Sequence, residues 1–154
     1  MVGGPGRIPL TLPRIATLVL YSLLLQDSVA FRVELPAAAH AGKPVPIVLR
    51  LTNRTEQPLT LALQGRPPAF DVTVTGPDGA IVWRRLEGAV VQSILAVRTL
   101  GPADGLTFEA VWDGRRRDGS PAPPGWYLVA GKLLTDTPEG LVTRPTPLEL
   151  LAHP

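Results

Sequence analysis

The chain has 154 residues, room for one ordinary domain, and its 45% hydrophobic and 18% charged content is typical of a folded globular protein. It has no cysteine, which excludes disulfides and thiolate metal sites, and its two histidines leave little material for a catalytic triad or a zinc site. Fifteen basic residues face 13 acidic ones, and removing Met1–Ala30 (two Arg, one Asp) leaves 13 against 12, so no overall charge draws the domain to nucleic acid.

The first thirty residues have the layout of a secretory signal peptide. Basic residues precede an uncharged apolar run at 15–25, and small residues ending with Ala30 precede a cleavage point before Phe31. The run is shorter than the roughly 20 residues of a membrane-spanning helix. We therefore expect residues 1–30 to be a leader and the domain to occupy 31–154, exported to the periplasm, the cell envelope or the medium. An uncleaved anchor and a misplaced start codon, which would leave the domain cytoplasmic, are the alternatives.

Short runs of alternating apolar and polar residues follow one another from Phe31 onward. This period of two is typical of half-buried strands, and Gly- and Pro-rich breaks recur between the runs. No amphipathic helix is evident after residue 30. The apolar segment 89–100 fits either one long strand or two. The expected strands cover 31–35, 47–52, 59–63, 70–75, 80–83, 89–100, 106–112, 126–131 and 142–150.

Eight or nine short strands predict an all-β fold, an immunoglobulin-like antiparallel β-sandwich preceded by a short apolar leader helix. A closed barrel is the alternative, but Pro145 and Pro147 in the last segment favour an open edge. The turn 76–79 predicts a hairpin. The stretch Val111–Gly131 predicts a second hairpin with a long, stiff, basic loop, because its prolines fix φ and its glycines allow positive φ.

The sequence does not place its histidines and aspartates in the patterns that catalysis or metal binding requires. His40 lies in a predicted loop and His153 in the C-terminal tail, and no Gly-x-Ser-x-Gly occurs. Asp113 and Asp118 flank three arginines, which would repel a calcium ion. The sequence therefore predicts a protein that is not an enzyme and has no metal or other cofactor.

Two proline-stiffened loops and one tryptophan are the candidate contacts for a protein partner. Trp83 and Trp112 fall in phase with inward-facing rows, whereas Trp126 is out of phase and is expected to be exposed at an interface. Rigid loops lose little entropy on binding. The candidate contact residues are Gln64, Arg66, Pro67, Pro68, Arg115, Arg116, Arg117, Pro123 and Trp126.

A series of short anchors between Asn53 and Leu133 follows the order and spacing of a known family. They are Thr52-Asn53-x-Thr55, Gly65, Phe70-Asp71, Gly79, Val82-Trp83, Leu100-x-Pro102, Trp112 and Pro124-Gly125-x-Tyr127-x-Val129-x-Gly131. This run resembles the BsuPI family, the intracellular proteinase inhibitors of bacilli and their bacterial relatives. The resemblance implies an immunoglobulin-like domain that binds a subtilisin-type serine protease.

A second resemblance covers only Trp112 to Tyr127. The pattern W-D-G-x3-D-G-x-P-x-P-P-G-x-Y is similar to the immunoglobulin-like module of flagellar hook-capping proteins. It implies the alternative function, a non-catalytic binding or assembly module of the bacterial cell envelope. On both hypotheses the partner is a protein, and a domain freed of its leader has no membrane segment.

Overall fold

The computed structural model describes residues 25–154, so most of the predicted leader, residues 1–24, lies outside the described part. Residues 25–28 are helical and lead directly into the first strand. The described chain then forms eleven strands, two of them only two residues long. These are β1 (Val29–Glu34), β2 (Ala39–His40), β3 (Val45–Asn53), β4 (Leu59–Gln64), β5 (Phe70–Thr75), β6 (Ile81–Arg84), β7 (Leu95–Leu100), β8 (Gly105–Trp112), β9 (Gly125–Leu133), β10 (Leu141–Val142) and β11 (Thr146–Leu151).

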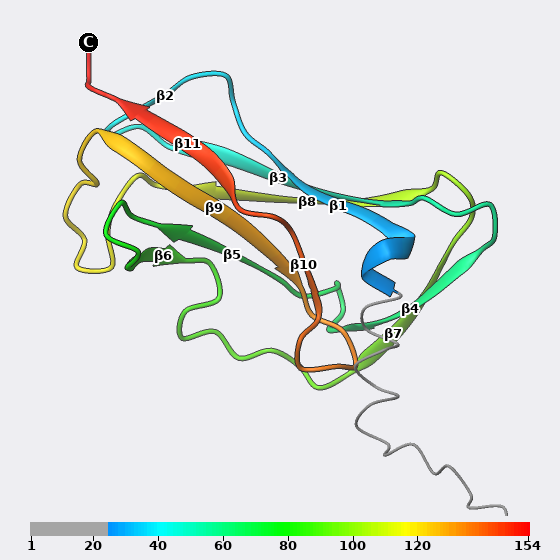
Figure 1. Ribbon diagram of the computed structural model, residues 1–154. Helices are drawn as coiled ribbons and strands as arrows, with labels where there is room; N and C mark the ends of the chain where they lie inside the picture. Colours follow the sequence, from blue (N-terminus) through cyan, green and yellow to red (C-terminus); the bar gives the residue numbers. More distant parts are fainter. Residues whose placement is uncertain (1–24) are drawn as a thin grey trace, which may run out of the picture.

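The strands form two facing layers (Figure 1). One sheet has the order β1-β3-β8, and the other has the order β2-β11-β9-β5-β6 with β10 beside β9. All pairings are antiparallel except the short β2–β11 contact. This is an immunoglobulin-like β-sandwich, as predicted. The count exceeds eight or nine because β2 and β10 are too short to show a period of two.

The predicted hairpin at Val111–Gly131 is wrong. β8 pairs with β3 in one sheet, whereas β9 pairs with β5 and β11 in the other, so the loop 113–124 crosses between the layers. Trp112 and Tyr127, at the two sides of this crossing, face the common core with ring centroids 5.5 Å apart. The predicted hairpin at residues 76–79 is confirmed, because β5 and β6 pair across that turn.

The core lies between the sheets and consists of the inward-facing residue of each alternating pair. Ile47, Leu49 and Leu51 of β3 are fully buried, as are Val72 and Val74 of β5. The two sheets approach each other tightly at β9, where a Cβ on Gly131 would lie 2.5 Å from Leu49 Cδ2. Gly131 is therefore needed for the close approach of the sheets.

β4 and β7 form a two-stranded ribbon that continues β3 and β8 past a sharp corner. The ribbon bends across to the second sheet, which it reaches at the Leu63–Thr135 bridge. The apolar segment 89–100 becomes a strand only from Leu95, and Val90, in the irregular part, is 96% exposed. The predicted last strand is likewise divided, because β10 and β11 are separate.

Asn53 holds the corner of this ribbon. Its side chain is 1% exposed, and its amide nitrogen donates to the backbone oxygens of Gln57, Leu100 and Gly101 at 2.8–3.1 Å. Its amide oxygen accepts from the backbone and hydroxyl of Thr55. One buried side chain thus joins the β3–β4 turn to the β7–β8 turn.

Candidate functional site

The two predicted contact loops lie at opposite ends of the sandwich. The loop 64–69 leads into Phe70, which pairs with Leu133, whereas the loop 113–124 leads into the start of β9. The length of β5, six residues or roughly 20 Å, separates the two ends. Each loop is therefore treated as a separate candidate.

The loop 113–124 is braced by its own hydrogen bonds. Arg115 pairs with Pro121 as an isolated bridge, and Arg116 N donates to Ser120 O at 2.8 Å near the tip. The Trp112 indole donates to Arg115 O at 2.8 Å, and the Arg115 guanidinium donates to Gly119 O at 2.9 Å. These bonds favour the predicted stiffness of the loop, although the loop joins two sheets and is not a hairpin.

Tyr127 anchors the other side of the same loop. Its hydroxyl donates to the backbone oxygen of Pro123 at 2.6 Å. A tyrosine near the start of this strand, bonded to the backbone just upstream, is the tyrosine corner of immunoglobulin-like folds. Burial raises the pKa of Tyr127, since the phenolate would lose hydration. Ala122, 1% exposed, also fixes the loop to the core.

A groove of about 520 Å³ separates this loop from the β5–β6 turn. Arg116, Arg117 and Asp118 line the side of the 113–124 loop, and Asp78 and the apolar Ile81 line the side of the turn. The residues that complete the lining are Gly76, Pro77, Ala80, Val82, Pro123, Pro124 and Tyr127. An apolar floor with a few charged groups at its rim is the usual form of a binding site.

The charged groups at the groove differ in how far they are already paired. Hydrogen bonds from Ser120 hold the pKa of Asp118 below its ordinary value. Arg117 Nε donates to Glu87 Oε2 at 3.0 Å, and both side chains are about half exposed. No ion pair engages Arg116 within residues 25–154. Arg116 is therefore the cation that this rim offers to a ligand.

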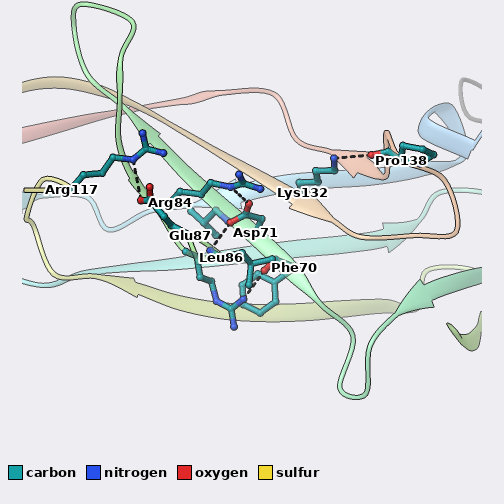
Figure 2. A network of polar contacts seen from close by, with 10 residues as sticks. Phe70, Asp71, Arg84, Leu86, Glu87, Arg117, Lys132 and Pro138 are labelled. Atoms are coloured by element: carbon teal, nitrogen blue, oxygen red, sulfur yellow. Dashed lines mark hydrogen bonds and ion pairs between the residues drawn. The ribbon is translucent and has the colours of Figure 1, made fainter. Parts of the chain in front are cut away.

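A buried carboxylate fixes the strand beside the groove. Figure 2 shows Asp71 between Arg84 and Leu86: its side chain accepts from Arg84 Nε at 2.6 Å and from Leu86 N at 3.0 Å. Asp71 is 4% exposed, so these bonds replace lost hydration. Next to it, Arg85 lies 3.7 Å from the centre of the Phe70 ring and donates to Phe70 O. The Phe70-Asp71 pair thus holds the end of β6 and the turn that follows.

The second predicted loop, at Gln64–Pro68, does not line the groove of about 520 Å³. Gly65 N donates to Ile94 O at 2.7 Å, and Ala69 N donates to Gln64 O at 2.7 Å, so the ends of the loop are tied. Arg66 and Pro67 are exposed, whereas Gln64 and Pro68 are partly buried.

Trp126 lies on the outer face of β9, and the prediction that it is exposed is confirmed at 58%. The prediction of a core residue is confirmed for Trp112, which is fully buried, whereas Trp83 is only partly buried and packs against the core. Trp126 borders a small hollow of about 220 Å³ formed with Pro36–Ala39 and β11. Trp126 does not line the groove of about 520 Å³.

The wall at residues 76–82 is the part of the site that the sequence did not predict. From its sequence, the Gly-Pro-Asp-Gly turn predicts only a hairpin. In an immunoglobulin-like strand order, this turn lies at the same end as the connection into β9, and that placement is the signal that would have found it.

Within residues 25–154, no cluster of three or more His, Asp or Glu side chains is placed to hold a metal ion. His40 lies on β2 with Nδ1 3.4 Å from Ala152 O, and His153 lies in the exposed tail. Among the same residues, no helix has the length and apolar character to cross a membrane.

No family model matches the chain, and no curated protein matches its sequence. The CARDB domain of a Pyrococcus furiosus protein, in complex with metal ions, is similar at 11% identity with a TM-score of 0.42, over 81% of this chain and 94% of that chain. The DNA glycosylase AlkC of Pseudomonas fluorescens, bound to DNA, is similar at 16% identity with a TM-score of 0.44, over 90% of this chain and 37% of that chain. A β-glucosidase of Listeria innocua, in complex with glucose, is similar at 12% identity with a TM-score of 0.40, over 79% of this chain and 16% of that chain. The likeness is one of strand arrangement, and the metal ions, DNA and glucose belong to those other proteins.

Proposed function

We propose that this chain is a non-catalytic binding module that engages a protein partner through the groove between residues 76–82 and the loop 113–124. The observation that carries the proposal is the groove of about 520 Å³ with walls held in place before any partner arrives. Tyr127 and Arg115 fix one wall, and the β5–β6 pairing fixes the other. Preformed walls lower the entropic cost of binding. The predicted leader and the resemblance of 112–127 to hook-capping modules favour a partner in the cell envelope.

Site-directed photocrosslinking tests this proposal. A photoreactive amino acid at Ile81, 41% exposed in the groove, is expected to capture a defined partner from envelope fractions. The same label at Val97, 67% exposed on β7, is the matched control and is expected to capture none. Arg116→Glu should reduce the yield at Ile81 because it reverses the available charge. Equal capture from both positions, or capture only from cytosol, would contradict the proposal.

Inhibition of a subtilisin-type serine protease is the second candidate. The likeness to the BsuPI family and the stiffness of the loop 113–124 favour it. The tip of that loop is a closed turn, with Gly119 N bonded to Arg116 O at 2.9 Å, whereas a segment that fills a protease cleft is extended. The closed tip is the reason for ranking this function second.

A titration separates the two candidates. The purified protein is mixed with a subtilisin-type protease, residual activity is measured, and the intact mass is read afterwards. Stoichiometric inhibition with an uncut chain would establish the inhibitor. Undiminished protease activity would leave the binding module, and cleavage within 115–117 would identify the loop as a substrate.

A further inference from the structure

A second groove, of about 530 Å³, runs along the outer edge of β1 and is separate from the proposed partner site. Four consecutive residues of the strand, 29–32, line it together with residues 142, 144 and 146 near the start of β11. Successive side chains of a strand point to opposite faces, so a consecutive lining means that the groove follows the backbone edge. The groove is therefore an open seam between the two sheets.

The backbone edge of β1 on this seam has no strand beside it within residues 25–154. β1 pairs with β3 on its other side through all six of its residues. Across the seam, Val142 N is bonded to the side chain of Gln26 at 3.3 Å, and Thr143 N turns inward to Gly131 O. The far wall is thus satisfied locally, and the β1 edge is the surface left for an added strand.

The charges on the seam are unbalanced. Arg32, Arg54 and Arg144 line it, with Asp27 as the single acidic residue. Arg32 pairs with Glu34 at 2.9 Å. No ion pair engages Arg54 or Arg144 in the described part of the chain, and both are exposed. These two cations outweigh Asp27, so the seam presents a net positive charge to a ligand that lies along β1.

We propose that the β1 seam binds an extended acidic segment of a partner protein, which adds as a strand to β1 and places carboxylates against Arg54 and Arg144. Backbone bonds supply affinity in this mode, and the side chains that flank the added strand supply selectivity. Charge complementarity also speeds association and rejects basic segments.

Two other occupants fit the seam less well. The chain's own first 24 residues contain two arginines and no acidic residue, so they cannot neutralise Arg54 and Arg144. A second copy that pairs through its own β1 edge would bring Arg32 and Arg54 of both copies together, which like-charge repulsion disfavours.

Peptide binding to the full chain tests the proposal. The probe is a fluorescein-labelled ten-residue peptide of alternating glutamate and threonine, followed by fluorescence anisotropy at low salt. Two comparison peptides isolate the two interactions. In one, lysine replaces glutamate and reverses the charge. In the other, proline replaces threonine, which keeps the charge but removes every second backbone donor and disfavours strand pairing. We expect saturable binding of the first peptide and at least about tenfold weaker binding of both others.

Charge reversal then locates the contact. The double variant Arg54→Glu/Arg144→Glu should weaken binding of the glutamate–threonine peptide by about tenfold or more, whereas Arg98→Glu, an exposed arginine on β7, should leave it within about twofold. Hydrogen exchange of residues 29–34 should slow on binding, and that of the loop 113–124 should not change.

The proposal is overturned by no saturable binding below about 1 mM, by equal affinity for the proline peptide, or by an unaffected double variant. Protection of the loop 113–124 in place of β1 would also overturn it. Because the two grooves share no lining residue, failure here leaves the proposed function at the first groove intact.

Discussion

The two ends of the sandwich hold their loops in different ways. At one end, the loop 113–124 is braced by its own bonds and encloses a groove with the β5–β6 turn. At the other end, Asn53 and the backbone of residues 64–69 tie neighbouring turns to one another. Both ends are rich in glycine and proline, so composition alone does not distinguish them. The ends differ in their hydrogen bonds, which lie within one loop at residues 113–124 and join several turns at the other end.

This difference predicts where substitutions act. A bond between turns is shared by several strands, and its loss is expected to lower the stability of the whole fold. A bond inside a loop shapes a surface, and its loss is expected to change binding more than unfolding. The following substitutions test that distinction.

The largest effect is expected at Asn53. Asn53→Ala removes a buried side chain with five hydrogen-bond contacts and leaves carbonyls of Leu100 and Gly101 without that donor. We expect a loss of about 2–4 kcal/mol in the free energy of unfolding, measured by urea denaturation. Gln57→Ala is the matched control, because it keeps the backbone oxygen that Asn53 contacts. A variant that unfolds like the wild type would show that the corner does not depend on this side chain.

The second effect concerns where the domain begins. Val29 is 4% exposed and pairs with Asn53, and Ser28 O accepts from Arg54 N. A chain that begins at Phe31, the predicted cleavage point, lacks these contacts, whereas one that begins at Leu25 keeps them. We expect the shorter chain to be less stable by about 2 kcal/mol, mostly from the lost burial of Val29. Equal melting temperatures would instead support a domain boundary at residue 31.

Alternation in the sequence was sufficient to predict most strands and the sandwich. It did not predict which strands are neighbours, because a 12-residue connection suits both a hairpin and a crossing between sheets. The sequence therefore predicts a hairpin at Val111–Gly131, where the structure has a crossing. The buried position of Asp71 was also hidden, since it lies in the outward-facing row of β5 and is covered by the turn at residues 84–86, which lies elsewhere in the sequence.

The candidate site was half predicted for the same reason. Local composition predicts a stiff loop at Arg115–Arg117 and Pro123. The hydrogen bonds that brace this loop join residues close together in the sequence. The opposite wall, at residues 76–82, comes from a distant hairpin and depends on strand order. Local chemistry can be derived from neighbouring residues, whereas a groove between two loops requires the topology.

Tyr127→Phe tests the bracing of the groove end. The change keeps the ring in the core but removes the bond to Pro123 O, so we expect a loss of about 1 kcal/mol at neutral pH. The folded-state pKa of Tyr127 is raised, so the unfolded chain loses this proton first. Its contribution to stability is complete below about pH 10 and is lost as the pH rises through the folded-state pKa. Between pH 8 and 11, the free energy of unfolding should therefore fall less steeply for Tyr127→Phe than for the wild type. Parallel curves would show that other groups cause the alkaline loss.

The smallest effect on stability is expected at the groove rim. Arg117→Ala removes a half-exposed pair with Glu87, and Arg116→Ala removes a cation that has no ion-pair partner in residues 25–154. Each should change the free energy of unfolding by less than about 0.5 kcal/mol. If the groove binds the partner, Arg116→Ala nevertheless reduces photocrosslinking from Ile81. Asn53→Ala, studied below its melting temperature, should leave that crosslinking intact. The opposite pattern, with Arg116→Ala unfolding the protein, would mean that the rim supports the fold and that the two ends do not differ as described.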